Sequence, residues 1–321
     1  MQQMALIGSG GGGCVYIGRW RGVTVAIKFI VSSNDDQLVR SQREALLSRL
    51  ASHPHVVQTY ATSVTQLAEN MFKAKGRAKY SIHEVLRQLG AHEQQFLTMV
   101  VMGPFHRDTT SWSPRMLLRS TVRTALEIAH GMQHLHLSGL VHGDLKPGNV
   151  LLKGSNQDKR KFVAKVSDLG IAHPVGAADE MSIDDGQIGS IAYMAPEVFK
   201  GRMMKASDVY SFGVLLWQLV CGTGSSPYEG AHPMAIALGV SEGKLSLRWP
   251  PGVFRPLQQL GELCTQTDPA ARPSFKSVVG ALEKLERHMQ RLAAASAASG
   301  ATASPPTSGI LASNSGPGGG R

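Results

Sequence analysis

Cysteine is scarce in this chain, and long apolar runs are missing from it. The 321 residues include three cysteines, Cys14, Cys221 and Cys264, which lie far apart and form no Cys-x-x-Cys pair. A disulfide framework or a zinc site is therefore not expected, and a reducing, cytoplasmic compartment is. No apolar run approaches the ~18 residues of a membrane span, and no basic segment followed by an apolar block opens the chain. We expect neither secretion nor a membrane span.

Acidic residues are outnumbered by basic ones. Asp and Glu number 23 against 33 Lys and Arg, which gives a formal net charge of +10. Such a balance favours polyanionic partners, nucleotides among them, without identifying one. The C2H2 spacing, RNP signature and basic heptads of nucleic-acid-binding proteins are missing, so nucleic acid is not expected as a partner. Hydrophobic residues make up 42% of the chain, which predicts that most of it is globular.

The pattern along the chain predicts a small β-rich region, a larger helical region and a low-complexity end. We place the boundaries at residues 1–103, 104–290 and 291–321. Alternating apolar residues predict strands at Met4–Ile7, Cys14–Trp20, Val23–Val31, Val56–Val64 and Phe96–Met102. Helical periodicity predicts helices at Leu38–Leu50, Pro114–Leu137, Ser207–Cys221, Val253–Thr267 and Ser274–Leu292, with Ser207-Asp208 as a cap.

Two segments have little that would drive folding. In residues 291–321, 23 of 31 are Ala, Ser, Gly or Pro, so we expect a disordered tail. The insert Gln66–Gln95 is long for a connection between strands, and its segment Ile82–Leu89 has helical character. A solvated basic loop is the simpler interpretation, and a docking surface for a partner is the alternative. The basic residues of the insert are Lys73, Lys75, Arg77 and Lys79.

A glycine-rich string and a lysine stand close together near the start. Residues Gly8–Val15 read GSGGGGCV and satisfy G-x-G-x-x-G-x-V. A backbone without side chains can approach phosphates and present N–H groups to them. The string lies between two expected strands rather than before a helix, which argues against a Rossmann fingerprint. Val25–Lys28 then puts a lysine into an apolar strand, where it needs an anion such as a phosphate or Glu44.

Three further strings follow in the second half. His142–Asn149 reads HGDLKPGN, Ser167–Gly170 reads SDLG and Ala195–Glu197 reads APE. With the glycine-rich string and the lysine, this set resembles the eukaryotic protein kinases, which carry H-R-D-L-x-x-x-N, D-F-G and A-P-E in this order. Within that family, the strings Ser207–Val214 and Ala271–Phe275 are similar to those of the tyrosine-kinase-like group, which mostly phosphorylates serine and threonine.

The resemblance implies a fold and an activity. The fold would be α+β and bilobal, with a small β-rich N-lobe that has one main helix and a larger, mainly helical C-lobe. The activity would be transfer of the γ-phosphoryl group of ATP to Ser or Thr hydroxyls of a protein substrate. ATP and Mg2+, or Mn2+ in its place, would be the cofactors. Lys146-Pro147 inside the catalytic loop suits Ser/Thr rather than Tyr specificity.

The resemblance also implies roles for single residues. Asp144 would accept the proton of the substrate hydroxyl, Lys146 would steady the transferred group, and Lys28, paired with Glu44, would hold the α and β phosphates. Asn149 and Asp168 would hold the metal ion. Asp208 would support the catalytic loop through backbone hydrogen bonds. The remaining expectations are nucleotide contacts from Ile7, Gly8, Ser9, Gly10, Gly11, Gly12, Gly13, Val15 and Ala26, activation-segment hydroxyls at Ser182 and Ser190, and a bracing ion pair of Glu197 with Arg272.

One residue departs from the family pattern. Gly143 stands where most kinases have an arginine, whose guanidinium pairs with a phosphate on the activation segment. Acidic residues already surround Ser182 in this chain. We therefore predict that activity does not depend on phosphorylation of the segment, as in the non-RD kinases.

Alternatives to an active protein kinase fit the same residues less well. A pseudokinase-like nucleotide-binding scaffold usually lacks the lysine or one of the two aspartates, and all are present here. A small-molecule kinase would lack A-P-E and the arginine. Cys14 as a reactive thiol, and His130 with His134 as metal ligands at i, i+4 spacing, are less economical interpretations than packing residues.

Overall fold

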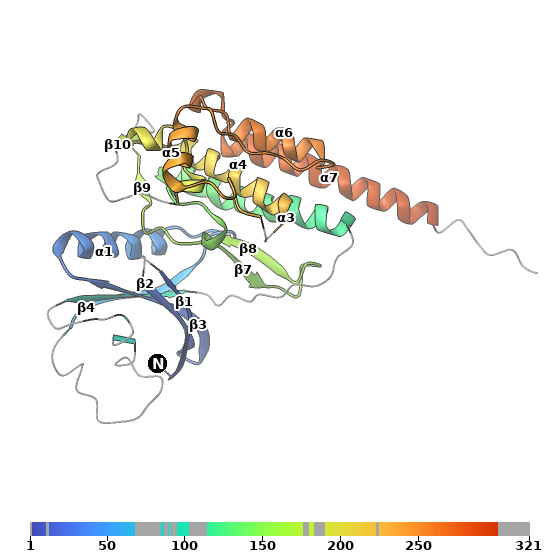
Figure 1. Cartoon of the computed structure of the whole chain (residues 1–321). Coiled ribbons are helices and arrows are strands. Elements are labelled where there is room, and N and C mark those ends of the chain that lie inside the picture. The colour runs from blue at the N-terminus through green and yellow to red at the C-terminus, as the bar shows by residue number, and fades with distance from the viewer. Residues whose placement is uncertain are drawn as a thin grey trace, which may run out of the picture.

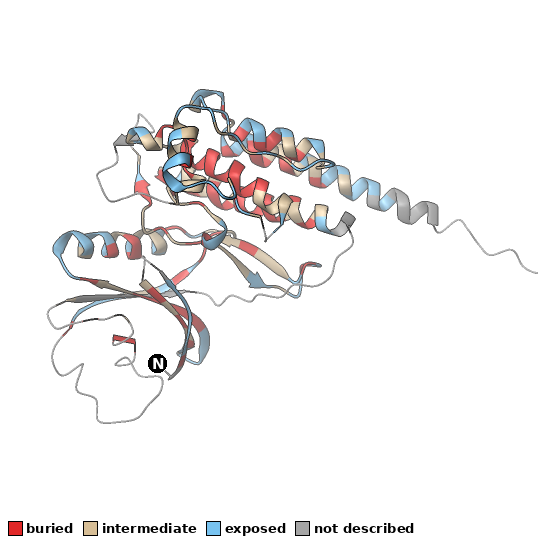
Figure 2. Ribbon diagram, in the orientation of Figure 1, coloured by how far each residue is buried: buried red, intermediate tan, exposed pale blue. Residues whose placement is uncertain are grey.

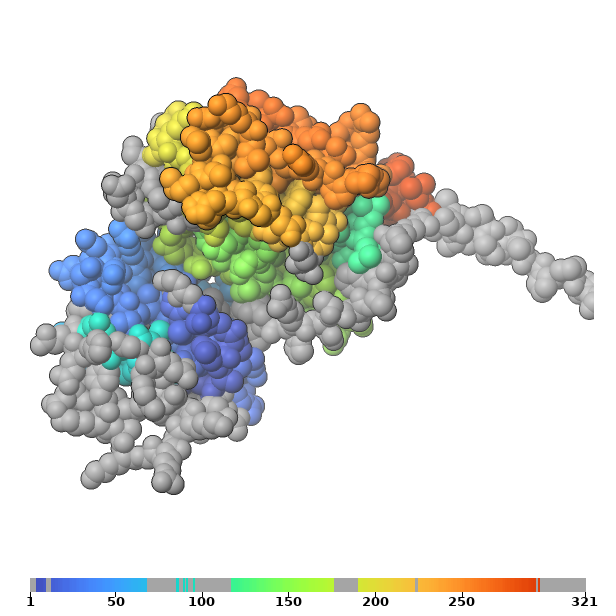
Figure 3. All heavy atoms as spheres, in the orientation of Figure 1, coloured from blue at the N-terminus to red at the C-terminus, as the bar shows by residue number. Residues whose placement is uncertain are grey.

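The computed structural model has two lobes stacked on one another (Figures 1 and 3). It describes residues 2–10, 13–67, 85–86, 89, 91, 95–102, 114–175, 180–182, 190–222 and 225–300. The N-lobe, up to residue 102, is a sheet with one long helix, and the C-lobe, from residue 114, is mainly helical. The expected bilobal α+β architecture is confirmed.

The N-lobe sheet is antiparallel, with the strand order β1-β2-β3-β5-β4. Its strands are β1 (Gln2–Gly10), β2 (Gly13–Trp20), β3 (Val23–Ser32), β4 (Thr59–Gln66) and β5 (Phe96–Met102). Side chains alternate between the two faces of a strand. Cys14, Tyr16, Ile27 and Phe29 are buried in the core of the lobe, so the residues between them face the other side of the sheet.

Helix α1 (Asp35–Leu50) follows β3 and begins three residues before the predicted start. The Asn34 side chain caps it by accepting the N–H of Gln37 at 2.9 Å. The strand predicted from Val56 begins at Thr59 instead, because Val56 forms a bridge to Val166 of the C-lobe. The backbone after α1 is therefore attached to the other lobe.

The C-lobe helices are α3 (Pro114–Leu137), α4 (Lys205–Cys221), α5 (Pro233–Ser241), α6 (Arg255–Cys264) and α7 (Phe275–Gly300). Large apolar side chains such as Ile128, Phe212 and Leu257 are fully buried between them. Figure 2 shows α4 buried along most of its length. Helix α4 begins before Ser207, so this residue is not the cap; its hydroxyl accepts the N–H of Met204 from inside the first turn.

Short elements between α3 and α4 hold the loops of the C-lobe. Strand β6 (Leu140–Val141) pairs with β9 (His173–Pro174), β7 (Val150–Gly154) with β8 (Phe162–Val166), and β10 (Glu180–Ser182) with β11 (Arg202–Met204). Single 3-10 turns lie at η2 (Pro147–Asn149), η3 (Ile191–Tyr193), η4 (Val198–Lys200) and η5 (Pro269–Ala271). The β7–β8 hairpin brings the catalytic string next to the residues that precede Asp168.

Helix α7 continues to Gly300, ten residues into the segment predicted to be disordered. Its last turns are rich in alanine, the residue with the highest helix propensity, which explains the extension. Residues 301–321 lie outside the described residues, as does most of the insert Gln66–Gln95; of the helix predicted there, Val85 and Leu86 are described and helical. Among the described helices, none combines the length and apolar character that a membrane span requires.

Candidate active site

The glycine-rich string forms the hairpin between β1 and β2. Gly8 pairs with Val15, and Gly10 with Gly13, while Gly11 and Gly12 at its tip lie outside the described residues. Gly13 has φ +110°, and a Cβ there would lie 2.1 Å from the carbonyl oxygen of Phe29, so only glycine fits. Ile7, directly before the string, is 52% exposed, and Ser9 within it is exposed as well. The hairpin thus offers backbone rather than bulky side chains.

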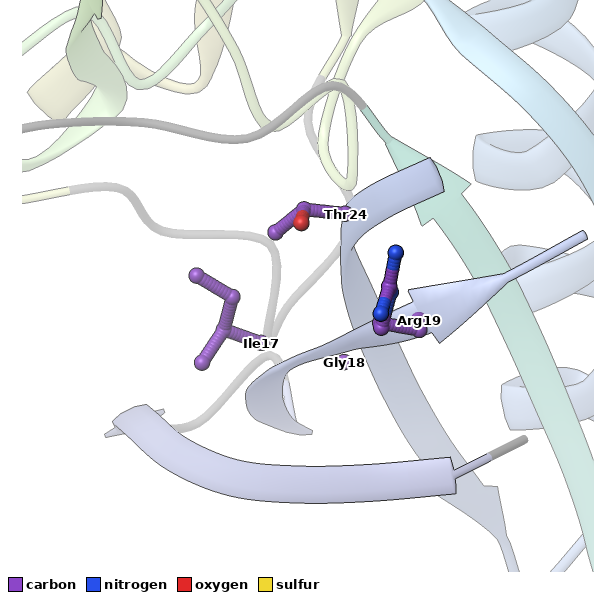
Figure 4. Close-up of a pocket in the computed structure, with 4 residues that line it drawn as sticks. All are labelled: Ile17, Gly18, Arg19 and Thr24. Carbon is purple, nitrogen blue, oxygen red and sulfur yellow. The ribbon is translucent and has the colours of Figure 1, made fainter. Parts of the chain in front are cut away.

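One face of β2 and β3 carries the predicted nucleotide contacts. Val15 lies directly opposite Lys28, and Ile17 opposite Ala26, which is fully buried. These positions alternate with the core residues of the N-lobe, so they share the face away from that core. A shallow depression lined by Ile17, Gly18, Arg19 and Thr24 continues this face towards the far end of the hairpin (Figure 4).

Lys28 joins the two lobes through two carboxylates. Its Nζ lies 2.7 Å from Oε1 of Glu44 on α1 and 2.9 Å from Oδ1 of Asp168 in the C-lobe. Burial alone would lower the pKa of Lys28, but the two carboxylates outweigh it and raise the pKa above its usual range. Burial likewise would raise the pKa of Asp168, and the Lys28 ammonium outweighs it, so that pKa is lowered. Two carboxylates share one buried cation here, which leaves unbalanced negative charge.

Asp168 lies in a strained backbone conformation. Its φ is +64°, a left-handed value that is uncommon for residues other than glycine and that concentrates at functional sites. Oδ1 accepts the N–H of Gly170 at 3.3 Å, and a Cβ on Gly170 would lie 3.1 Å from Glu44 Oε2. Glycine at position 170 therefore lets Glu44 of the other lobe approach.

The catalytic string is organised around Asp144. Its Oδ2 lies 2.6 Å from Nζ of Lys146 and accepts the Asn149 amide at 3.0 Å, while Oδ1 accepts the Ser190 N–H at 2.9 Å. Lys146 Nζ also donates to the Ser190 hydroxyl at 2.7 Å. The structure thus places the Lys146 ammonium within hydrogen-bond distance of both a carboxylate and a hydroxyl.

The two predicted metal ligands lie next to a pair of neighbouring strands, Asn149 before β7 and Asp168 after β8. The carbonyl oxygen of Asn149, just before β7, accepts both the N–H and the hydroxyl of Ser167, just after β8. Asn149 and Asp168 are thereby placed at the same end of the β7–β8 hairpin. The described residues contain no group of three or more His, Cys, Asp and Glu side chains that could hold a metal ion.

Asp208 fixes the backbone of the catalytic string from below. Its Oδ2 accepts the N–H of His142 at 2.8 Å and contacts His136 Nε2 at 2.8 Å, while Oδ1 accepts the N–H of Gly143 at 2.9 Å. The carboxylate is 1% exposed. The sequence indicated Asp208 but not His136, whose place on α3 was visible only as a third histidine in that helix.

Glu197 and Arg272 form a forked ion pair inside the C-lobe. The two N–O distances are 2.7 and 2.8 Å. The remaining guanidinium N–H groups donate to the carbonyl oxygens of Gln266, Ala206 and Thr267. Every donor of the arginine is used, as a buried charge requires. Ser182 is the other hydroxyl predicted in the activation segment. It lies in β10, where its backbone pairs with that of Arg202 in β11.

Gly143 accommodates a contact that the sequence did not reveal. It has φ +77°, and a Cβ there would lie 2.9 Å from the Sδ of Met203 and 3.3 Å from the Ile171 carbonyl oxygen. Met203 is 2% exposed and belongs to β11, which pairs with β10 of the activation segment. A methionine thus covers the position from which an arginine side chain would start.

Comparison with known proteins gives a consistent result. A family model described as protein tyrosine and serine/threonine kinase matches residues 1–282. Mitogen-activated protein kinase kinase kinase 11 of Homo sapiens is 34% identical over 298 residues, which are 89% of this chain and 31% of that protein. Serine/threonine-protein kinase VIK of Arabidopsis thaliana is 31% identical over 290 residues, which are 88% of this chain and 59% of that protein.

The family model runs through both lobes and spans every string on which the resemblance rests. The chain covers less than two thirds of the length of either relative. With a family model matched over most of its length, the chain belongs to the protein tyrosine and serine/threonine kinase family.

Proposed function

We propose that the chain transfers the γ-phosphoryl group of ATP to serine or threonine hydroxyls of protein substrates. The observation that carries the proposal is the arrangement of Asp144, Lys146 and Ser190 in the C-lobe beside a lysine that bridges both lobes. Phosphoryl transfer depends mainly on positioning and on neutralising charge, and these residues provide for both.

The nucleotide would lie against the face of β2 and β3 that carries Val15 and Ala26, beneath the glycine-rich hairpin. Lys28 would hold its α and β phosphates. The pairing with Glu44 supports this role, because it fixes the ammonium in position while burial keeps it from water.

A divalent cation would be held by Asn149 and Asp168. An amide oxygen and a carboxylate oxygen are ligands that Mg2+ prefers, and Mg2+ completes its shell with water and phosphate oxygens. The unbalanced negative charge around Lys28 favours such a cation. When bound, the cation neutralises charge on the phosphate oxygens.

Asp144 would act on the substrate. The hydroxyl oxygen attacks the γ-phosphorus, the bond from that phosphorus to the β–γ bridging oxygen breaks, and the hydroxyl proton passes to the Asp144 carboxylate. Lys146, 2.6 Å from that carboxylate, would stabilise the charge on the transferred group. Its contact with the Ser190 hydroxyl supports Ser/Thr over Tyr specificity, since it keeps the ammonium beside the reacting oxygen.

Transfer of labelled phosphate from ATP tests the proposal. A generic basic protein and a mitogen-activated protein kinase kinase serve as substrates, the second because of the name of one relative. We expect transfer to Ser or Thr by the wild type and none by Asp144→Asn or Asp168→Ala. Unchanged transfer by the Asp144 variant would overturn the catalytic assignment.

The second candidate function is a nucleotide-binding scaffold, which the glycine-rich string also supports. A thermal-shift titration with Mg-ATP separates the two. Stabilisation by nucleotide without any transfer to either substrate would favour the scaffold.

A further inference from the structure

Four histidines meet where the loop after α1 rests on α3. His53 and His55 belong to the loop, and His130 and His134 lie one turn apart on α3. The rings of His53 and His134 are stacked, with centroids 4.9 Å apart and planes 16° apart. Those of His55 and His130 are stacked at 6.0 Å and 20°. We call these four residues the histidine cluster; it joins the N-lobe to the C-lobe through two stacked imidazole pairs.

The backbone beneath the histidine cluster leaves it little room to separate. A Cβ on Gly131 of α3 would lie 2.5 Å from the carbonyl oxygen of His55, so the loop crosses the helix at close range. The N–H of His55 donates to His53 Nδ1 at 3.1 Å, and His55 Nδ1 lies 3.2 Å from the carbonyl oxygen of Ala164 on β8. Rings that acquired charge here could not move apart without moving the loop.

A lysine opposes positive charge on the histidine cluster. Lys165 of β8 donates to the carbonyl oxygens of Pro54 and Val56, on either side of His55. Its ammonium disfavours protonation of both loop histidines. Lys153 of β7 adds a further positive charge near Lys165.

Two carboxylates face the histidine cluster, and neither is placed to neutralise all of it. Glu127 of α3 favours charge on His55, but its oxygens already accept from Arg160 and from the Ala164 N–H. Glu283 of α7 lies 3.9 Å from His130, at the edge of an ion pair. The stacked pair of His53 with His134 has no acidic partner among these contacts.

The loop histidines are accordingly held neutral. Burial first, and then the imidazoles of the other three histidines, lower the pKa of His53 to about 4. Burial is also the main cause that lowers the pKa of His55. A histidine with a lowered folded pKa stabilises the fold fully above its unfolded pKa of about 6.5, and this contribution is lost as the pH falls towards the folded pKa. For His53 that window runs from about pH 6.5 to about 4, with up to about a tenfold rise in the unfolding constant per pH unit.

We propose that the histidine cluster is a proton-sensitive joint between the lobes, which fixes α1 when the imidazoles are neutral and loosens it when they become charged. The loop is the C-terminal anchor of α1, and α1 carries Glu44, the partner of Lys28. Acidification therefore makes α1 more mobile, and Glu44 is then held less firmly against Lys28. Where the proposed kinase activity holds, it also slows phosphoryl transfer.

The test compares melting temperatures between pH 7.5 and 5.5 for the wild type, His53→Asn and His232→Asn. The amide introduced by His53→Asn keeps an oxygen that can accept the His55 N–H but does not titrate. His232 is an exposed N-cap of α5 that accepts the Met234 N–H, and asparagine is an equally good cap, so this variant is the matched control. We expect the wild type and the control to lose about 2–4 °C more than His53→Asn on acidification. Parallel curves for all three proteins would overturn the proposal.

Two further measurements keep the outcome decisive. An NMR titration of the wild-type imidazoles should show the His53 ring neutral down to about pH 5, and titration of that ring near pH 6.5 would contradict the joint. Initial rates at pH 7.5 and 4.5, where the folded His53 ring begins to take up its proton, should fall less in His53→Asn than in the wild type. A protein without transfer at either pH, whose melting curves still diverge, would overturn the proposed function and support the joint.

Discussion

The ion pair of Lys28 with Glu44 lies at the boundary of the lobes, whereas that of Arg272 with Glu197 lies inside the C-lobe. Both are buried, but their surroundings differ. The arginine uses all its donors on protein acceptors, with one carboxylate for one guanidinium. The lysine is shared between two carboxylates, one of them Asp168, whose side chain is 37% exposed.

The difference is one of charge balance. Arg272 and Glu197 form a complete pair, with one cation for one carboxylate, whereas Lys28 forms an incomplete pair because two carboxylates share one cation. A complete buried pair contributes to the fold because its loss leaves an uncompensated charge. A pair with excess carboxylate can still gain from a further cation, which fits the nucleotide and metal site that we propose there. Substitutions at the two sites should therefore change different observables.

The largest expected effect is on the rate, at the incomplete pair. Lys28→Met keeps the apolar stem of the lysine and removes its charge, so packing changes little. Phosphoryl transfer at saturating ATP should fall on the order of a thousandfold, because the phosphates lose their fixed cation. Labelled transfer measures the rate and a melting curve measures the fold. Wild-type turnover in this variant would refute the assignment of the nucleotide site.

The same replacement at the complete pair should act on stability. Arg272→Met leaves Glu197 buried without its cation, and we expect a loss of about 3–5 kcal/mol in the free energy of unfolding. Urea denaturation of this variant beside Lys28→Met measures the contrast. Arg272→Lys serves if the methionine variant does not fold, and should lose less because it keeps the charge but not the fork. Equal stability losses at Lys28 and Arg272 would mean that the two ion pairs do not differ in their contribution to the fold.

An intermediate effect is expected at Gly143, which directly precedes Asp144. Gly143→Ala must adopt a left-handed φ and push against Met203, whereas Gly201→Ala, at φ +76°, meets nothing within 4 Å. Both variants bear the backbone strain of about 1 kcal/mol, and only the first adds the clash. We expect Gly143→Ala to be the less stable by about 1–2 kcal/mol in urea denaturation. Equal stabilities would mean that Met203 yields readily and does not fix this loop.

The smallest effect concerns the activation segment, whose strand β10 pairs with β11 through the backbone. Phosphatase treatment, with mass spectrometry to verify that Ser182 and Ser190 are bare, should leave initial rates within about twofold. Ser182→Ala should behave likewise. A collapse of activity in both experiments, reversed by rephosphorylation, would contradict this prediction. It would show that a basic pocket binds the phosphate in place of the arginine that is missing at position 143.

Local patterns predicted much of this fold. Phe96–Met102 and Pro114–Leu137 have the predicted bounds because alternation and helical periodicity are properties of neighbouring residues. Val56 departs from its predicted strand because its partner Val166 lies in the other lobe. The last helix was predicted to end at Leu292 and runs on to Gly300, because composition alone does not show that alanines can extend an existing helix.

The candidate site was predictable where family strings mark it, and not where the partners lie far apart in the sequence. The strings locate Asp144 and Asp168, but nothing in them shows that Met203 covers Gly143. In the sequence, the histidines of α3 look like unrelated packing residues. Their partners His53 and His55 lie much earlier in the chain, in the N-lobe. Only the folded chain brings His53 onto His134.

The carboxylate of Asp208 has a consequence for how this molecule tolerates change. It holds two consecutive peptide groups just before Asp144, and it belongs to α4, whose residues from Ser207 to Trp217 are all buried. The hydrophobic core thus sets the position of the Asp144 carboxylate, to which we assign the substrate proton. Substitutions in surface loops leave this position unchanged. A substitution that changes a side-chain volume deep in α4 moves Asp208, and with it the Asp144 carboxylate.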